Sequence, residues 1–284
     1  SLGFYNGFLP EISDEHTINR VSAWGYALGY LGGALALVLA MLVSMFGERL
    51  GLPELADQLR VGVFIMGAWW GLFTLPTLWV LRDRGQRRAQ RISVVRTVAA
   101  ALGEVRHTLG NVRRYRMLAL FLVGFLFYND GIQTVISQAS TLAMKELSFE
   151  SRELGLLILM IQFVALPGAL VVGRLADRFG QKPTLMGCLA VWVALVVGAY
   201  FVTTKAQFWA LGIVLALVMG GTQSVSRAIM GVMTPAARTA EFFGFFNFSG
   251  KATSFLGTFA FGYILWVGGG VRLAVLSLLV FFLI

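Results

Sequence analysis

Two ionisable side chains stand deep inside apolar stretches of the sequence. Asp130 comes thirteen residues after the start of the apolar span at Met117, and Lys251 comes nine residues after the start of the span at Phe242. A charge at the centre of a bilayer costs about 2.5–3.5 kcal/mol on insertion scales, so such residues are expected to face protein or water. Asp130 therefore indicates a proton or cation site, or a partner for a substrate ammonium, and Lys251 indicates a carboxylate site. A permanent Asp130–Lys251 pair, or a Lys251 that extends to the surface, is the structural alternative.

Asn129 and Gln133 extend the polar character around Asp130. Positions 129 and 133 are i, i+4 neighbours on a helix, and 130 and 133 are i, i+3 neighbours. The three side chains are predicted to form one polar patch that contacts a solute or a proton.

A second polar group follows in the apolar span at 208–230. Gln223, Ser226 and Arg227 are spaced i, i+3, i+4 and share a helix face. Asn247 lies four residues before Lys251 on the next span. All are candidate solute contacts. The alternative is that Arg227 anchors its helix at the membrane surface and that Asn247 likewise has no solute contact.

Enzyme chemistry is not expected from these residues. No base, nucleophile and orienting group occur together, so proton transfer fits better than covalent catalysis. The two histidines, His16 and His107, and the one cysteine, Cys188, leave no disulfide and no zinc-ligand spacing. Neither a metal nor another cofactor is expected.

The elements that carry these residues are predicted to be membrane helices. Only 13% of the residues are charged and 57% are hydrophobic, whereas a soluble domain has about 25% charged residues. Apolar runs long enough to cross a hydrocarbon layer of about 30 Å lie at residues 21–46, 61–81, 117–139, 154–172, 184–202, 208–230 and 242–267. The fold class is therefore all-α, a polytopic transmembrane helical bundle. The apolar ends at 1–9 and 273–284 are interpreted as parts of further helices.

The distribution of positive charges predicts the orientation of the chain in the membrane. Sixteen of the 23 Lys and Arg residues, ten of them in the linker 82–116, fall on one side of the membrane and six on the other. The positive-inside rule places the linker in the cytoplasm, which favours the plasma (inner) membrane. Apolar residues at helical spacing in the linker suit a helix on the lipid surface, so lipid is the expected partner and nucleic acid is not.

An internal repeat organises the chain. Residues 25–32 and 250–257 share the string G-x-A-x-x-[YF]-L-G at an offset of 225. Two halves of like orientation are typical of some secondary transporters. The predicted division is residues 1–81 as the end of a first half, 82–116 as a linker and 117–284 as a second half. The same offset predicts about four helices before Ser1, missing partners from the same chain.

The turn at residues 173–182 reads GRLADRFGQK and resembles a signature of the major facilitator superfamily. The residues that match are Gly173, Arg174, Asp177, Arg178, Gly180 and Lys182. The glycines are expected to permit a tight turn, and the cations to face anionic lipid headgroups. The carboxylate is expected to accept a hydrogen bond from the N-terminus of a neighbouring helix. We expect that neighbour to be the helix that begins near residues 19–22. An ordinary basic turn is the alternative.

A narrower resemblance rests on FYNGFLPEI (4–12), RVSAWGYALGYLGG (20–33), FLFYNDGIQTV (125–135), GGTQSVSRAIM (220–230) and EFFGFFNFSGK (241–251). Together these blocks are similar to the vacuole-effluxer-like group of facilitators. The resemblance implies a major facilitator fold, here from about the end of helix 4 to the start of helix 12. It also implies a permease for a small polar solute such as an amino acid, with proton coupling as one option. A non-transporting sensor or receptor on the same fold is the alternative.

Overall fold

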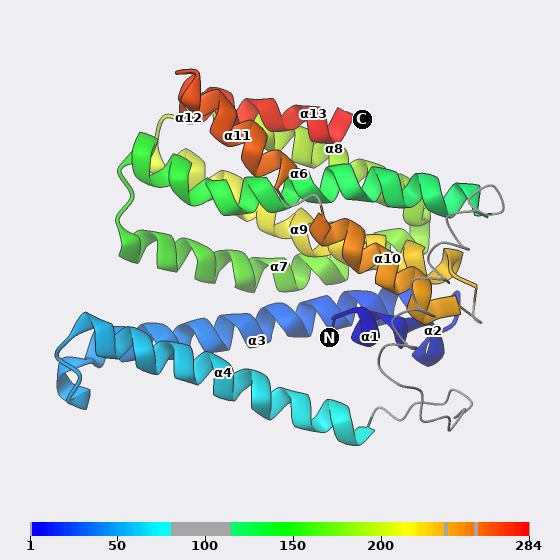
Figure 1. Ribbon diagram of the computed structural model, residues 1–284, viewed down its shortest axis with the longest axis horizontal. Coiled ribbons are helices and arrows are strands. Elements are labelled where there is room, and N and C mark those ends of the chain that lie inside the picture. The colour runs from blue at the N-terminus through cyan, green and yellow to red at the C-terminus, as the bar shows by residue number, and fades with distance from the viewer. Residues whose placement is uncertain (1, 81–114, 236–237, 253–254, 284) are drawn as a thin grey trace, which may run out of the picture. The chain divides into compact units, whose positions relative to one another are not determined.

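The computed structural model describes residues 2–80, 115–235, 238–252 and 255–283. These residues fold into helices without strands (Figure 1). The helices are α1 (Leu2–Gly7), α2 (Leu9–Ile12), α3 (Ile18–Phe46), η1 (Glu48–Leu50), α4 (Leu55–Val80), α6 (Arg116–Leu147), α7 (Ser151–Phe179), α8 (Gln181–Phe201), α9 (Lys205–Met233), α10 (Thr239–Ala252), α11 (Leu256–Trp266), α12 (Gly270–Leu276), η3 (Ser277–Leu279) and α13 (Val280–Leu283).

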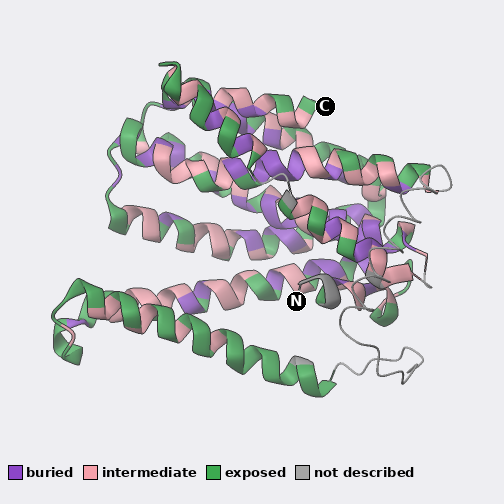
Figure 2. Ribbon diagram, in the orientation of Figure 1, coloured by how far each residue is buried: buried purple, intermediate pink, exposed green. Residues whose placement is uncertain are grey.

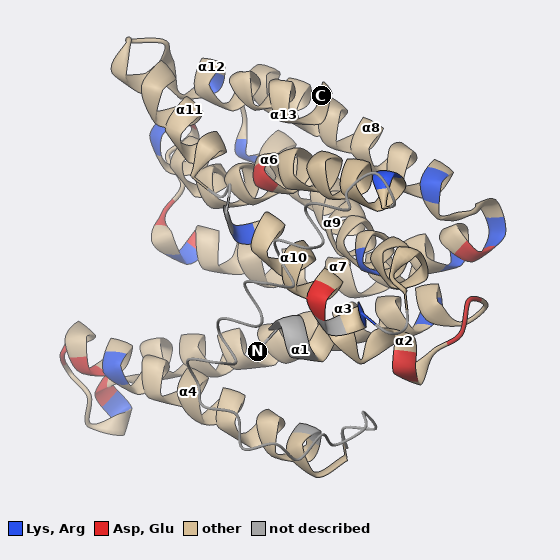
Figure 3. Ribbon diagram, turned by 45° about the vertical axis from the view of Figure 1, so that its right-hand side comes forward, with Lys and Arg blue, Asp and Glu red and all other residues tan. Residues whose placement is uncertain are grey.

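Six of these helices, α3, α4 and α6 to α9, are long and apolar enough to cross a membrane by length and composition. Charged residues lie mostly near the helix ends, and most of each helix carries none (Figure 3). The prediction of an all-α polytopic bundle is confirmed.

The chain divides into two compact units. One contains residues 1–30 together with 108–284, and the other contains residues 31–107. The predicted amphipathic helix and nearly all of the linker lie outside the described residues. The division at 81 and 116 stays a prediction.

The described part of the second unit consists of the later part of α3, η1 and α4. Its helices pack through small residues, because Gly62 lies against the side chain of Ala40. Most of the large apolar residues of α4 are exposed, among them Phe64 and Trp79. Most of the α4 ribbon is accordingly coloured as exposed in Figure 2. An apolar exposed face of this kind suits lipid.

The first unit is built around the contact between α7 and α9. A Cβ at Gly168 would lie 2.5 Å from the backbone oxygen of Leu217, and a Cβ at Gly220 would lie 3.0 Å from the backbone oxygen of Ala165. Small residues therefore let the two helix backbones meet. Aromatic side chains of α8 and α10, including Trp192 and Phe243, complete the buried core.

The last two apolar stretches fall on shorter helices. Residues 242–252 belong to α10 and residues 256–266 to α11, and residues 273–283 belong to α12, η3 and α13, which follow one another directly. At the start of α11 the backbone N–H of Gly257 donates to Asp130 of α6, 2.7 Å away. A side chain from another helix thus satisfies one of the N–H groups that a helix start leaves open.

The backbone contact predicts a stability effect at Gly168. Gly168→Ala forces a Cβ into the backbone of α9, and overpacking of this kind costs about 1–3 kcal/mol. Thermal unfolding of the detergent-purified protein should show a lower midpoint. Gly187→Ala on α8 is the matched control, because its Cβ would meet nothing within 4 Å. Equal midpoints for the two variants would contradict the α7–α9 packing.

Candidate functional site

Arg227 of α9 is the centre of a buried polar cluster. Its side chain is 4% exposed, and three hydrogen bonds hold it. Nε donates to Ser22 Oγ at 2.9 Å, Nη2 to the Ser22 carbonyl oxygen at 2.7 Å, and Nη1 to Asn6 Oδ1 at 3.2 Å. The guanidinium therefore joins α9 to α1 and to the first turns of α3.

Two tyrosine rings surround the same guanidinium. Its central carbon lies 4.6 Å from the centre of the Tyr26 ring and 5.8 Å from that of Tyr5, within the range of cation–π attraction. Gly25 makes the approach possible, since a Cβ there would lie 2.7 Å from Nη2.

Other polar residues extend the cluster over neighbouring helices. Asn6 Nδ2 donates to Asn247 Oδ1 of α10 at 3.4 Å. The Tyr30 hydroxyl donates to Gln223 Oε1 at 2.8 Å. Two further hydroxyls, those of Tyr128 on α6 and Ser226 on α9, lie 2.7 Å apart and share a hydrogen bond. The structure thus brings together four sequence-predicted site residues, Gln223, Ser226, Arg227 and Asn247.

The partners of Arg227 are all neutral. Among the described residues no carboxylate forms an ion pair with it. A buried charge is costly without compensation, and here hydrogen bonds and ring faces supply it. Its burial also contradicts the alternative that Arg227 extends to the membrane surface.

Asp130 forms a second, separate cluster near the middle of α6. It is 1% exposed, and its Oδ2 accepts the Gly257 N–H. Two atoms beside this contact, Asp130 Oδ1 and Thr134 Oγ1, have no hydrogen-bond partner within the described structure. Asn129 Nδ2 donates to the carbonyl oxygen of Gly250 on α10 at 3.2 Å.

Gln133 and Lys251 are placed differently from Asp130. Both are exposed, whereas Asp130 is enclosed by α11. The predicted polar patch of α6 is thus buried at Asp130 and exposed at Gln133. The spacing of Asp130 and Gln133 fixes a helix face approximately, but the start of α11 determines which part of that face is covered.

The GRLADRFGQK turn lies beside the start of α3. Asn19, the second residue of α3, donates from Nδ2 to Asp177 Oδ1 at 3.0 Å, and Gln181 Nε2 donates to Asn19 Oδ1 at 2.7 Å. Asp177 is thus at the predicted helix end, although its donor is a side-chain amide rather than the backbone. Gly173 packs on Ala23, where a Cβ would lie 2.6 Å from the alanine methyl.

The other residues of the turn lie at or near the junction of α7 and α8. Gly180 has φ +91°, a conformation that favours glycine, at the junction of α7 and α8. The cations Arg174, Arg178 and Lys182 are exposed. We call the side of the first unit that contains this turn and the start of α6 the linker side.

The loop before α3 contains one perturbed carboxylate. Asp14 accepts hydrogen bonds from the side chain and backbone of Thr17 and from the backbone of His16. These bonds, chiefly the one from the Thr17 hydroxyl, lower the pKa of Asp14 below its usual value. The carboxylate therefore stays ionised beside the N-terminus of α3.

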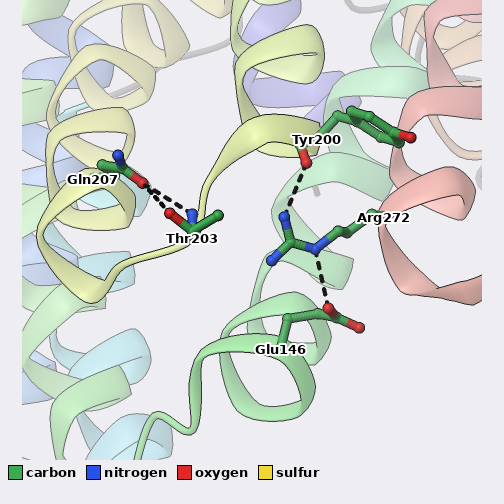
Figure 4. Close-up of polar contacts among 5 residues, drawn as sticks. All are labelled: Glu146, Tyr200, Thr203, Gln207 and Arg272. Atoms are coloured by element: carbon green, nitrogen blue, oxygen red, sulfur yellow. Dashed lines mark hydrogen bonds and ion pairs between the residues drawn. The ribbon is translucent and has the colours of Figure 1, made fainter.

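Ion pairs connect the opposite ends of the helices, which we call the far side. Arg272 of α12 donates from Nε to Glu146 of α6 at 3.0 Å and from Nη1 to the Tyr200 carbonyl oxygen of α8 at 3.1 Å (Figure 4). Lys205 of α9 pairs with Glu153 of α7 at 2.6 Å. These contacts all lie within residues 116–283.

Sequence reasoning missed Asn6, Ser22, Tyr26 and Thr134. Each is a polar residue within or beside an apolar stretch, which was the available signal. Small hydroxyl and amide groups are also common where helices pack, so the sequence did not separate them from packing residues.

Comparison with solved structures identifies the fold of the chain. The fold resembles a crystal structure of the major facilitator transporter FucP in the outward conformation, with a TM-score of 0.69 at 15% sequence identity. The match covers 99% of this chain and 69% of that one. A crystal structure of a single-residue variant of the Escherichia coli fucose:proton symporter FucP gives a TM-score of 0.67 at 13% identity, covering 98% of this chain and 70% of that one. The chain thus has the major facilitator fold.

The family model for vacuole effluxer Atg22-like proteins matches residues 10–284, so the chain belongs to that family. It is 32% identical to the uncharacterized MFS-type transporter YxiO of Bacillus subtilis (strain 168), over 99% of this chain and 65% of YxiO. It is 26% identical to autophagy-related protein 22-1 of Neosartorya fischeri, over 92% of this chain and 46% of that protein. The chain thus spans about half to two thirds of the length of these relatives.

The Arg227 cluster predicts a loss of stability when Asn6 is removed. Asn6→Ala takes away a hydrogen-bond acceptor from a buried cation, and hydrogen bonds to charged groups contribute about 1.5–3 kcal/mol. The midpoint of thermal unfolding should fall, and the effects of Asn6→Ala and Asn247→Ala should not add, because the two amides share a bond. Gln133→Ala, on an exposed part of α6, should leave the midpoint unchanged. An Asn6→Ala midpoint equal to that of this control would contradict the cluster.

Proposed function

We propose that the protein is a secondary active transporter that moves a small polar solute across a membrane by alternating access. Amino acids are the leading candidate substrates, because they fit the amide, hydroxyl and charged groups in the clusters. The name of the YxiO relative, an MFS-type transporter, and that of the vacuole effluxer family support this proposal.

The observation that carries the proposal is the set of buried polar contacts on the linker side of the first unit. On the linker side, Arg227 and Asp177 connect residues 1–30 to the helices between 116 and 283. On the far side, the ion pairs of Arg272 and Lys205 stay within residues 116–283. Contacts between residues 1–30 and the later helices are what rocking between two halves requires, because they must break and form again when access changes.

Roles for individual residues follow from their chemistry. Arg227, with Gln223, Ser226 and Asn247 around it, supplies donors for an anionic or polar group of the solute. Asp130 is the proposed proton site, with Asn129 beside it. Gln133 and Lys251, both exposed, are proposed to face the solute path. The distribution of Lys and Arg supports placing the linker on the cytoplasmic side of the plasma membrane.

The proposed proton site predicts a separation of two transport modes. In the full-length protein reconstituted in liposomes, Asp130→Asn should abolish pH-driven uptake but retain counterflow exchange, because exchange needs no net proton movement. Uptake of labelled amino acids, with and without a pH gradient, measures both modes. Asp57→Asn is the control, since Asp57 is a surface carboxylate paired with Arg60, and it should behave like the parent protein.

Two results would contradict the proposal. Driven uptake that is unchanged in Asp130→Asn would remove the proton role from Asp130. A full-length protein that moves no solute in either mode, but changes the activity of a partner protein, would favour a membrane sensor on the same fold.

A further inference from the structure

We propose that Ser22 and Asn6 occupy the place of a solute carboxylate on Arg227, so that the solute binds there by displacing α1 and the start of α3. The proposal rests on the proposed function, because it names the chemical group of the solute that Arg227 binds and the contact that this group replaces. It assigns to Ser22, a residue of the chain itself, the role of a competitor of the solute.

Ser22 presents two oxygens to one edge of the Arg227 guanidinium. Its Oγ accepts from Nε at 2.9 Å, and its backbone carbonyl oxygen accepts from Nη2 at 2.7 Å. Adjacent N–H groups of a guanidinium form a fork that binds the two oxygens of a carboxylate through parallel hydrogen bonds. Ser22 therefore fills, with two neutral oxygens, the position that a carboxylate takes on an arginine.

The Ser22 hydroxyl is fixed as an acceptor toward Arg227. It donates its one hydrogen to the carbonyl oxygen of Ser224 on α9, 2.7 Å away, so a lone pair of the same oxygen faces Nε. Asn6 Oδ1 adds a third neutral acceptor, at 3.2 Å from Nη1. All three acceptors come from the first 30 residues, and all are buried.

The cluster lacks a negative charge among its described members. A guanidinium has five N–H donors, and three of them have an acceptor in the described part of the chain. The rings of Tyr5 and Tyr26 attract the cation but carry no net charge. Hydrogen bonds between ionised groups are roughly twice as strong as those between neutral ones. A carboxylate that replaced the neutral oxygens would therefore bind Arg227 more strongly than they do.

A carboxylate fits the cluster better than a phosphate does. Arg227 is the one cation among the side chains that the described structure joins in this cluster, and a carboxylate carries one negative charge. A phosphate ester carries about −1.5 to −2 at pH 7, so in a buried site it would need a second cation beside Arg227.

The fork becomes free only when the backbone of α3 moves. One of the two Ser22 acceptors is a backbone carbonyl oxygen within a helix, so a change of side-chain rotamer does not release Nη2. Movement of α3 away from α9 also breaks the contact between Asn19 and Asp177 on the linker side. Carboxylate binding and the closed linker side therefore exclude each other, and the solute favours the state in which that side is open.

Equilibrium binding to the purified full-length protein tests the proposal. The neutral L-amino acids and their α-amides are measured one at a time by equilibrium dialysis, because each amide keeps the ammonium and the side chain but loses the carboxylate. An amino acid that binds should do so at least about tenfold more tightly than its amide, the change expected when hydrogen bonds between charged groups are lost. Inorganic phosphate should not compete with it.

Ser22→Ala separates competition from a structural role. Alanine removes the Oγ that competes with the solute, so the affinity for the amino acid should rise about two- to tenfold, the effect of one neutral hydrogen bond. A serine that only packs would leave the affinity unchanged or lower it. Ser140→Ala is the matched control, because the Ser140 hydroxyl donates to the Ser137 carbonyl oxygen of its own helix, and this variant should keep the affinity of the parent protein.

Arg227→Lys tests the fork. Lysine keeps the positive charge but lacks the planar pair of donors, so the preference for the amino acid over its amide should fall about tenfold. The midpoint of thermal unfolding shows whether this variant is folded. If it is not, Ser22→Ala decides the test, because it leaves Arg227 in place.

Any of four results overturns the proposal. They are equal binding of an amino acid and its amide, binding of neither set, a Ser22→Ala affinity no higher than that of Ser140→Ala, and displacement of the amino acid by inorganic phosphate.

Transport assays separate this failure from that of the proposed function. Uptake of an amino acid by a protein that binds the acid and its amide equally overturns only this inference. Acid-selective binding that strengthens in Ser22→Ala, in a protein that moves no solute, supports the inference and contradicts transport.

Discussion

The buried guanidinium of Arg227 is the interaction on which the arrangement of the first unit depends. A cation away from water needs compensation from whatever surrounds it, and here that compensation comes from Asn6, Ser22 and the Tyr26 ring, all contributed by the first 30 residues. These residues are distant in sequence from α9, so the charge fixes where α1 and the start of α3 lie against it. The absence of a carboxylate among the described neighbours makes the cluster dependent on several weaker contacts. A set of weak contacts is easier to break and reform than one ion pair in a dry interior.

The two sides of the unit differ in a way that fits this reasoning. On the far side, charged pairs such as Arg272–Glu146 tie together helices that all come from residues 116–283. On the linker side, neutral amides and hydroxyls connect those helices to residues 1–30, as Asn19 does with Asp177. The first kind of contact favours a rigid group of helices, and the second favours an interface that changes. Asp130 lies apart from these contacts, because it binds the start of α11.

Much of the fold was predictable from the sequence, since α3, α4 and α6 to α9 each contain an apolar run of membrane-spanning length. Family membership was predictable from several motif blocks in order. The start of α11 was not, because it depends on Asp130, which lies 127 positions earlier in the chain. Helical spacing placed Gln223, Ser226 and Arg227 on one face. In the structure Gln223 and Arg227 bond to α3, and Ser226 bonds to Tyr128 of α6. Helical spacing does not show which neighbouring helices cover a face. The burial of Asp130 and the hydrogen bond from Arg227 to Asn6 are therefore seen only in the structure.

The central claim is that the linker-side contacts form in one state of the protein and break in another. Spin labels at two exposed linker-side positions, Arg20 at the start of α3 and Lys182 at the start of α8, allow the distance between these segments to be measured by pulsed electron paramagnetic resonance in the full-length protein. The account predicts two populations, a short distance with the Arg227 and Asp177 contacts formed and a longer one with them broken. It also predicts that Asn6→Ala shifts the distribution toward the longer distance. A single distance that stays the same in Asn6→Ala, across pH and with added amino acids, would contradict it.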